Sequence, residues 1–247
     1  MSVPLWLTRT ELLIGARSVE MLRQKHVLVC GLGGVGAMAA EQICRAGIGN
    51  ITIVDGDTIH PSNRNRQLPA LISTEGIAKA EVMRKRLLDI NPYLNLTVIN
   101  EYIKDQRMIE ILEKGYDYVI DAIDTLSPKV YLLFHAHRLR LPVVSSMGAG
   151  GKFDPGMVQV ADLDDSYTCK LAYYMRKRLH KLGVWKGIKV VFSPEVVARE
   201  AVALSEGEIN KKSTVGTISY MPAVFGCFCA SVVIRDLLEG NTLLEDC

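Results

Sequence analysis

Four glycines, Gly31, Gly33, Gly34 and Gly36, fall close together in the segment V-L-V-C-G-L-G-G-V-G. They follow a run typical of a strand and open a run typical of a helix, where glycines permit a tight turn and let backbone amides approach phosphate oxygens. Asp55 closes the next expected strand, where its carboxylate can accept hydrogen bonds from both ribose hydroxyls. A glycine turn that only packs helix on strand is the alternative, but it leaves Asp55 unexplained. The pattern therefore predicts a nucleotide site.

The residues after Asp55 separate two kinds of nucleotide. Asn63, Arg66 and Lys79 follow it, the last on the next expected helix. A dinucleotide used for hydride transfer needs no cations beside its glycine loop, whereas the tail of ATP, with about four negative charges, and its departing pyrophosphate do. Arg66 and Lys79 suit that role, with Asn63 as a neutral donor. A solvated basic loop is the alternative, but the pattern favours ATP.

Two carboxylates, Asp121 and Asp124, end the very apolar run Y-V-I-D-A-I-D. Ligands of open α/β sheets bind at the carboxyl ends of the strands. Magnesium usually takes one or two carboxylates together with phosphate oxygens. We expect Asp124 to hold Mg²⁺ or to contact the phosphates, with Asp121 supporting it. The alternative is that Asp124 only caps a following helix.

The elements expected to position these residues alternate between strand and helix from His26 to Met147, which is typical of βαβ units and a parallel sheet. The expected strands are His26–Cys30, Ile51–Asp55, Leu96–Asn100, Tyr118–Ile123 and Pro142–Ser146. The expected helices are Thr10–Arg23, Gly34–Arg45, Glu75–Ile90, Gln106–Lys114 and Lys129–Leu139. The fold class is therefore α/β, with a doubly wound, Rossmann-like and mostly parallel sheet.

The pattern changes after Met147. Strands are expected at Met157–Leu163 and Lys189–Phe192, with a basic helix at Leu171–Leu182 between them, so the second half continues the sheet with antiparallel strands. The sequence contains no Pro/Ser-rich linker. We expect a single domain over residues 1–247, with a nucleotide-binding half of about 1–147 and a substrate-side half of about 148–247.

Composition limits the classes of protein. The 247 residues include 49% hydrophobic residues and carry a formal charge of +2, so a packed core is expected and any nucleic-acid contact needs a local basic face. No two of the six cysteines form a C-x-x-C pair, so no zinc site is expected. The amino terminus lacks a signal-peptide pattern, which favours the cytoplasm. The apolar run Met221–Ile234 is shorter than a bilayer span of about 20 residues and is expected to be a buried helix, with peripheral membrane contact as the alternative.

Five motifs, in order and suitably spaced, resemble the adenylating family that includes the ubiquitin-activating enzymes and the thiamine- and molybdopterin-pathway adenylyltransferases. They are V-L-V-C-G-L-G-G-V-G, V-D-G-D, S-N-R-N-R-Q, G-x-A-K-A-E and D-A-I-D. The resemblance implies that ribose lies at Asp55, beside Asp57. It places Asn63, Arg66 and Lys79 around the triphosphate of ATP, and Asp124 near Mg²⁺ and the α-phosphate. The segment W-L-T-R-T-E-L-L-I-G is similar to the family's amino-terminal motif, which implies that Arg9 reaches the phosphates of the other subunit of a homodimer.

Within the family, the segments N-R-N-R-Q-L-P-A-L, Y-V-I-D-A-I-D and G-A-G-G-K-F-D-P resemble a branch of tRNA-modifying enzymes. The resemblance implies ATP-dependent dehydration and cyclisation of the threonylcarbamoyl group on an anticodon-loop adenosine, through an acyl adenylate that releases AMP and pyrophosphate. The first alternative is an adenylyltransferase that activates a ubiquitin-like sulfur-carrier protein, with cysteine desulfurase or sulfur-acceptor partners. The second is an NAD-dependent redox enzyme. The lack of C-x-x-C pairs disfavours the first alternative, and the cations after Asn63 disfavour the second.

A basic segment is the expected contact for tRNA. It comprises Arg176, Lys177, Arg178, His180, Lys181, Lys186 and Lys189, with Lys211 and Lys212, and it has aromatic neighbours at Tyr173, Tyr174 and Trp185. Basic groups hold phosphates and aromatic rings stack on unpaired bases. A solvated helix face is the alternative. Cys169 lies where a loop nucleophile could lie, but we expect it to serve only packing.

Overall fold

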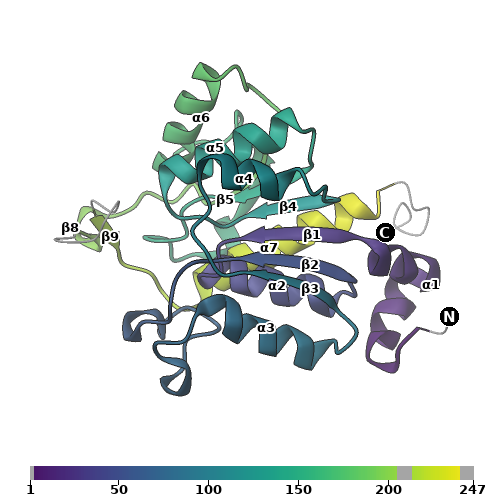
Figure 1. The fold of residues 1–247 in the computed structure, drawn as a ribbon. Coiled ribbons are helices and arrows are strands. Elements are labelled where there is room, and N and C mark those ends of the chain that lie inside the picture. The colour runs from purple at the N-terminus through teal and green to yellow at the C-terminus, as the bar shows by residue number, and fades with distance from the viewer. Residues whose placement is uncertain (1–2, 205–212, 240–247) are drawn as a thin grey trace.

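The computed structural model describes residues 3–204 and 213–239. Within them, seven strands form one sheet in the order β3-β2-β1-β4-β5-β7-β6 (Figure 1). The strands are β1 His26–Cys30, β2 Asn50–Val54, β3 Asn95–Ile99, β4 Tyr118–Asp121, β5 Val143–Ser146, β6 Gln159–Asp162 and β7 Lys189–Phe192. Every pairing is parallel except that of β6 with β7. The predicted α/β class, with antiparallel pairing in the second half, is confirmed.

Helices cover both faces of this sheet, as Figure 1 shows. They are α1 Thr8–Gln24, α2 Gly34–Arg45, α3 Lys79–Ile90, α4 Asp105–Leu112, α5 Leu126–Arg138, α6 Lys170–Lys181 and α7 Tyr220–Leu237. One hydrophobic cluster joins α2, α3 and α7 to the sheet, and a second joins α4, α5 and α6 to its other face. The two clusters correspond to the two faces of a doubly wound sheet.

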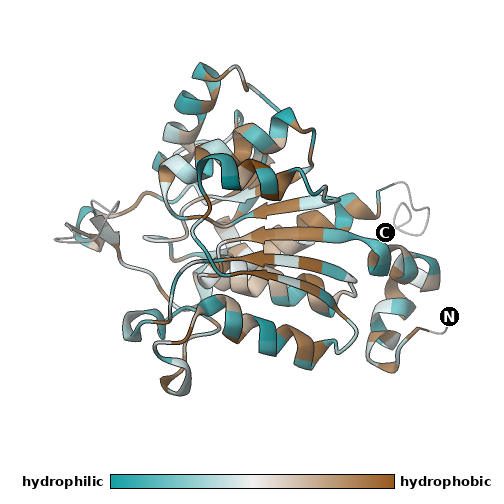
Figure 2. Cartoon of the chain, viewed as in Figure 1, coloured by the Kyte–Doolittle hydropathy of each residue, from teal (hydrophilic) through white to brown (hydrophobic). Residues whose placement is uncertain are grey.

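The strands alternate strictly between these two clusters. Val27 and Val29 of β1 belong to the first cluster, whereas Leu28 and Cys30 belong to the second. Since both faces are covered, the central strands are apolar at almost every position, which is typical of parallel sheets. Figure 2 shows hydrophobic residues concentrated along these strands, with hydrophilic residues on the outer sides of the helices.

Helix α7 belongs to the core. By length and composition it is apolar enough to cross a membrane. However, Met221, Phe225 and Cys229 are completely buried, and the Cα of Gly226 packs so closely on α2 that a Cβ would lie 2.5 Å from the carbonyl oxygen of Val35. The predicted buried helix is confirmed, and the alternative of membrane contact has no support, because the apolar residues are used for packing.

Several predicted boundaries are wrong, among them the start of α5, which lies at Leu126 rather than Lys129. Helix α3 begins at Lys79 rather than Glu75, because the preceding residues pair with another segment: Ile59 donates to the carbonyl of Ile77, and Gly76 donates to that of Ile59. Strand β4 ends at Asp121, whose carboxylate accepts the N–H of Ile123 and turns the chain. Helix α1 starts earlier than predicted and contains a break at Gly15, where φ is +79°.

A small two-stranded sheet was not predicted. Its strands are β8 Val202–Leu204 and β9 Ser213–Val215, and they pair antiparallel. Figure 1 shows this pair standing out from the body, on the side toward which the carboxyl ends of the parallel strands point. Val215 packs against Gly150, where a Cβ would lie 3.1 Å from the Val215 Cβ. The pair therefore lies next to the turn that follows β5.

Candidate nucleotide-binding site

The glycine loop joins β1 to α2 with the backbone packed too closely for side chains. Gly31 has φ of +90°, and a Cβ there would lie 2.7 Å from the carbonyl oxygen of Ala122. At Gly36 a Cβ would lie 1.8 Å from the carbonyl oxygen of Gly31, and Gly34 is pressed against Pro222 of α7. Gly33 occupies the N-cap position of α2. The positive dipole end of α2 therefore lies at this glycine turn, where we predict that the nucleotide phosphates bind.

Asp55 lies directly against this loop. Its Oδ2 accepts the N–H of Leu32 at 2.5 Å, and its Oδ1 accepts the N–H of Asp57 at 2.7 Å. Burial raises the pKa of Asp55, while the charge of Lys79 and the two backbone N–H groups oppose that rise. The carboxylate is therefore fixed at the end of β2, with lone pairs remaining for hydroxyl donors such as those of a ribose.

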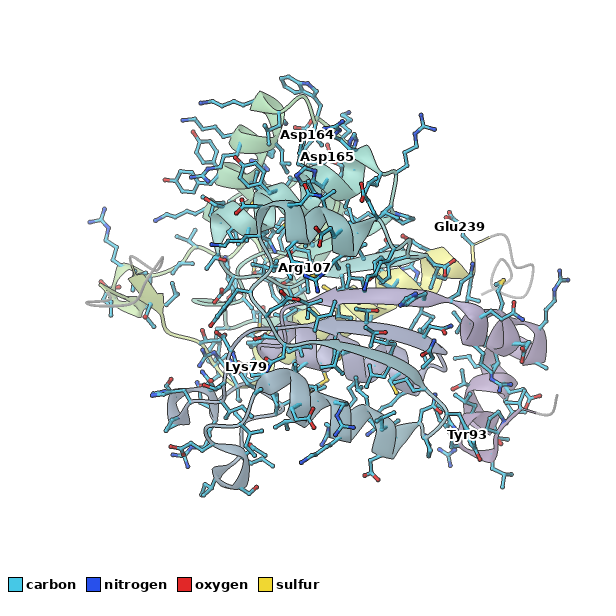
Figure 3. The ribbon with its side chains drawn as sticks, in the orientation of Figure 1. Lys79, Tyr93, Arg107, Asp164, Asp165 and Glu239 are labelled. Atoms are coloured by element: carbon cyan, nitrogen blue, oxygen red, sulfur yellow. The ribbon has the colours of Figure 1, made fainter. Side chains whose placement is uncertain are left out.

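Lys79 and Asp57 form an ion pair beside Asp55. The Lys79 Nζ lies 2.7 Å from the Asp57 Oδ2, and Lys79 is only 5% exposed. Figure 3 shows Lys79 at the start of α3, at the carboxyl edge of the sheet. Asp57 also accepts a hydrogen bond from the hydroxyl of Tyr102, which raises the pKa of Tyr102 to about 12. Asp57 therefore positions the ammonium group of Lys79.

Tyr102 lies in the electrostatic field of three carboxylates of the candidate site. After the hydrogen bond to Asp57 and burial, the charges of Asp55 and Asp124 add to the rise in its pKa. The charges that act on Tyr102 therefore come from residues that follow two different strands, β2 and β4. Tyr102 could not be predicted from the sequence, because no local pattern indicates that its hydroxyl donates to Asp57, a residue that follows another strand.

Asn63 and Arg66 lie on the loop that covers the glycine turn. The Asn63 Oδ1 accepts the N–H of His60 at 3.0 Å, so its oxygen holds the loop. The Arg66 guanidinium donates to the carbonyl of Ser62 and to the Asn65 Oδ1, both at 2.9 Å. The backbone of Arg66 lies against the glycine turn, where a Cβ on Gly34 would lie 3.0 Å from the Arg66 carbonyl oxygen. The guanidinium is close to the site, but it is bonded within its own loop.

Gln67, the next residue, is a candidate that sequence reasoning did not single out. Its Nε2 would lie 3.8 Å from a Cβ on Gly33, and its buried Oε1 has no hydrogen-bond partner among the described residues. Buried polar atoms are normally hydrogen-bonded, so an unpaired one beside a glycine turn indicates a place for a ligand. The motif S-N-R-N-R-Q includes Gln67, but its unpaired oxygen can be recognised only from the packing in the structure.

Asp121 and Asp124 have different environments. Asp124 is exposed at the end of the turn after β4, and the N-cap residue of α5 is Thr125 rather than Asp124. Asp121 is completely buried and pairs with Lys129 at 2.8 Å, while the Ser145 hydroxyl donates to it at 2.7 Å. Asp121 thus supports the turn that carries Asp124, and its predicted support of a Mg²⁺ or phosphate contact at Asp124 stays a prediction.

Lys129 is the main structural residue that sequence reasoning missed. It is completely buried, and besides its ion pair with Asp121 it donates to the carbonyl of Ile123 at 3.1 Å. Its partner lies eight residues earlier, across the turn that carries Asp124. A lysine on a predicted helix is normally read as exposed. Only the ion pair across the turn shows that this one is internal.

The described residues contain no group of three or more His, Cys, Asp or Glu side chains that could hold a metal ion alone. Mg²⁺ differs from zinc in this respect, because it is commonly bound by one or two carboxylates together with substrate phosphates and water. An exposed carboxylate beside an expected triphosphate, as at Asp124, fits that set of oxygen donors.

Arg9 is not part of the site that its own chain forms. It is exposed on α1, which Figure 1 shows at the amino ends of the parallel strands, opposite the glycine loop. Cys169 is 7% exposed and lies just before α6, as its N-cap residue, consistent with the packing role that we expected. The candidate site within one chain therefore comprises the glycine loop, Asp55, Lys79 with Asp57, the Asn63–Gln67 loop and Asp124.

The sequence of the chain matches a known protein family. The sequence model of the ThiF family matches residues 7–244. The chain belongs to the ThiF family. This confirms the predicted adenylating family. The ThiF-family chain is 38% identical over 239 residues to the tRNA threonylcarbamoyladenosine dehydratase of Bacillus subtilis, covering 94% of each, and 36% identical to that of Escherichia coli, covering 93% and 92%.

Solved structures give the same picture. The crystal structure of the Escherichia coli tRNA N6-threonylcarbamoyladenosine dehydratase in complex with ATP matches with a TM-score of 0.86 at 35% identity, over 94% of this chain and 93% of that chain. Its complex with AMP matches with a TM-score of 0.85 at 36% identity. The chain is also 32% identical, over 61% of its length, to the molybdopterin-synthase adenylyltransferase of the same bacterium.

Proposed function

We infer that this protein is an ATP-dependent tRNA threonylcarbamoyladenosine dehydratase. The observation that carries the inference is similarity to enzymes of that name along almost the whole of both chains, including structures of one of them with ATP and with AMP. The site agrees with it, because a glycine loop, a ribose-type carboxylate and a buried lysine meet at one edge of the sheet. Both halves of the chain contribute strands to one sheet, which supports a single adenylation domain over residues 1–247. In this proposal the enzyme acts on tRNA in the cytoplasm.

The first step activates an unreactive carboxylate. An oxygen of the threonylcarbamoyl carboxylate attacks the α-phosphorus of ATP in line, the bond to the β-phosphate breaks, and pyrophosphate leaves with its electron pair. Asp55 orients the ribose, and the α2 amino end and Lys79 stabilise charge on the phosphates. Arg66 joins them by giving up its bonds to Ser62 and Asn65. Mg²⁺, when bound at Asp124, neutralises further phosphate charge.

The second step is intramolecular. A ureido atom of the same threonylcarbamoyl group attacks the acyl carbon, AMP leaves carrying the former carboxylate oxygen, and the attacking atom loses its proton. The ring product is lighter by one water, and no nucleophile of the enzyme is consumed. Effective molarities of about 10⁵ M or more are known for well-oriented intramolecular attack, so positioning suffices. This agrees with Cys169 being buried in packing.

A second candidate is activation of a ubiquitin-like sulfur-carrier protein, with sulfur-acceptor partners. It rests on the shorter similarity to the molybdopterin-synthase adenylyltransferase. The first step would be the same with a different carboxylate, so the glycine loop cannot distinguish the two. Two observations disfavour this candidate. The sequence has no C-x-x-C pairs that could form a zinc site, and the similarity to the dehydratases covers more of the chain at higher identity.

One incubation separates these candidates. Purified protein with Mg²⁺, ATP and threonylcarbamoylated tRNA should release one AMP and one pyrophosphate for each modified adenosine that becomes lighter by one water. The same tRNA without the threonylcarbamoyl group should give no AMP. AMP release that requires a carrier protein ending in Gly-Gly, and that is unaffected by tRNA, would contradict the proposed function.

We also propose that Arg9 acts across a homodimer, since its helix lies at the end of the molecule away from its own glycine loop. Arg9→Ala and Lys79→Ala should each be nearly inactive. When the two variants are mixed and exchange subunits, a heterodimer contains one site with both residues intact, so about a quarter of the activity should return. Mixtures that remain inactive after confirmed exchange would reject the role of Arg9 in trans.

A further inference from the structure

Helix α6 and the loop after it carry an exposed face of cations and aromatic rings. Seven lysines and arginines occur from Lys170 to Lys189, with no aspartate or glutamate among them. Two of the predicted tRNA contacts are engaged elsewhere, because Lys189 pairs with Asp236 at 2.7 Å and Arg176 donates to the carbonyl of Ser166 at 2.6 Å. Ala172, Met175 and Leu179 are buried against the protein, so the opposite side of the helix faces solvent. We call this surface the α6 face. It comprises Lys170, Tyr173, Tyr174, Lys177, Arg178 and Lys181 on the helix and Trp185 and Lys186 after it, all exposed.

The lysines of the α6 face are not paired with acids. No ion pair involves Lys170, Lys177, Lys181 or Lys186 within residues 3–204 and 213–239. The basic segment on α3 is different, because Arg84 pairs with Glu81, and Arg86 pairs with Glu41. The two arginines on α3 are therefore neutralised, whereas the four lysines on the α6 face are not, which favours a polyanionic partner for α6.

Aromatic rings stand among these cations. Tyr173 is 53% exposed, Tyr174 52% and Trp185 62%. The rings of Tyr173 and Tyr174 meet edge to face, and Trp185 stacks on His180 with centroids 4.2 Å apart. Exposed aromatic rings beside lysines are suited to stacking on unpaired bases while the lysines hold the backbone phosphates.

The α6 face is connected to the nucleotide site. Arg178 donates to the hydroxyl of Ser127 at 2.9 Å, and Ser127 lies in the first turn of α5, three residues after Asp124. In Figure 1, α6 and α5 lie side by side on the same face of the sheet. A long substrate held on α6 can therefore extend along the start of α5 to the candidate nucleotide site at Asp124. The neighbouring acids, Asp164 and Asp165, lie beside α6 in Figure 3, and Asp164 contacts His180 at 3.4 Å.

We propose that the α6 face docks the anticodon stem-loop of tRNA, an inference that rests on the proposed function. Lys170, Lys177 and Lys181 hold phosphates, and Tyr173, Tyr174 and Trp185 stack on unpaired bases. An anionic membrane is the competing partner for a basic, aromatic surface. It fits less well, because a helix that lies on a membrane inserts its apolar side, and the apolar side of α6 is buried in the protein. The Lys211–Lys212 pair, which we also expected to contribute, lies outside the described residues.

The first experiment reverses charge on two surfaces. Lys177→Glu with Lys181→Glu changes the α6 face, and Lys85→Glu with Lys114→Glu makes the same change in net charge at other exposed positions. Binding of threonylcarbamoylated tRNA, measured by fluorescence anisotropy over a range of salt, should weaken about tenfold or more for the α6 variant, and its salt slope should fall by about two. The control should bind like the wild type. At saturating tRNA, kcat should be unchanged while KM rises.

The second experiment removes stacking. Tyr173→Ala with Tyr174→Ala should weaken binding of the anticodon stem-loop about tenfold but leave binding of a fully paired RNA duplex unchanged. Tyr93→Ala is the control, since Tyr93 is 87% exposed and lies well away from α6 in Figure 3. Equal losses for stem-loop and duplex would reject the stacking role of these tyrosines.

Failure of this inference is distinguishable from failure of the proposed function. If the wild type dehydrates tRNA and the α6 charge variant does so with the same KM, the docking surface is wrong and the function stands. If the α6 variant loses tRNA binding but the wild type releases no AMP with tRNA, the docking surface stands and the function is wrong. Loss of binding to phosphatidylglycerol vesicles with unchanged tRNA binding would overturn the proposal in favour of a membrane.

Discussion

The cations of the nucleotide-binding half and those of α6 are used in opposite ways. Lys79 is 5% exposed and held by Asp57, and Lys129 is completely buried and held by Asp121. The lysines of the α6 face are exposed and have no ion pair among the described residues. A buried, paired cation has a fixed position, whereas an exposed, unpaired one can follow a flexible partner. The first arrangement suits charge stabilisation at a reacting phosphorus, and the second suits docking of a polyanion.

The comparison also separates two kinds of dependence on salt. Interactions of exposed charges are screened by salt, while those of buried pairs are screened much less. We therefore expect salt to raise the KM for tRNA strongly and to change ATP turnover at saturating tRNA only slightly. If the paired cations of the nucleotide-binding half are as important as their burial suggests, replacing either Lys129 or Lys79 should have a large effect.

The largest effect is expected from breaking the buried pair. Lys129→Met leaves the Asp121 carboxylate in a site with no solvent exposure, so the free energy of unfolding should fall by about 3–5 kcal/mol. Urea denaturation monitored by circular dichroism measures it. Combining Lys129→Met with Asp121→Asn removes both charges and should restore much of the loss. A single variant as stable as the wild type would show that the pair does not hold the turn.

Lys79→Ala should lower ATP turnover by about 10²-fold, as removal of one preorganised donor does in other enzymes. Lys85→Ala, an exposed lysine on the same helix, is the matched control and should keep full activity. Pyrophosphate release in single turnovers, at saturating ATP and tRNA, measures the effect. A Lys79→Ala variant with turnover near that of the wild type would remove this lysine from the chemistry.

A smaller effect, dependent on pH, is expected at Glu41. This buried carboxylate bonds Arg86 and Arg45, joining α2 to α3. Burial acts to raise its pKa, but the bonds from the two arginines outweigh burial, so the pKa of Glu41 lies below its ordinary value of 4.5. A lowered carboxyl pKa contributes stability that is present above the unfolded value and is lost as pH falls through the folded one.

Glu41→Gln should therefore be less stable than the wild type by about 1.5 kcal/mol at pH 7, and this difference should shrink as the pH falls below about 4.5. Urea denaturation at pH 7, 5 and 4 measures the trend. A difference that is constant over this range would show that the charge of Glu41 is not what stabilises the contact between α2 and α3.

The parts of the site predicted from sequence are those encoded locally. The glycine loop and Asp55 could be predicted because a strand, a tight turn and the end of the next strand each have a short-range pattern. Lys129, Tyr102 and Gln67 could not, because their roles depend on partners across the sheet edge or on the absence of a partner. The start of α3 was misplaced for a related reason: a pairing between Ile59 and Ile77 competes with the helix.

The central claim is that the substrate carboxylate attacks the α-phosphorus of ATP. Threonylcarbamoylated tRNA labelled with ¹⁸O in its carboxylate tests it directly when the AMP released in one turnover is analysed by mass spectrometry. The account predicts one ¹⁸O atom in AMP and none in pyrophosphate, because the carboxylate oxygen leaves on the α-phosphate. Label appearing in inorganic phosphate, with ADP as the nucleotide product, would contradict it.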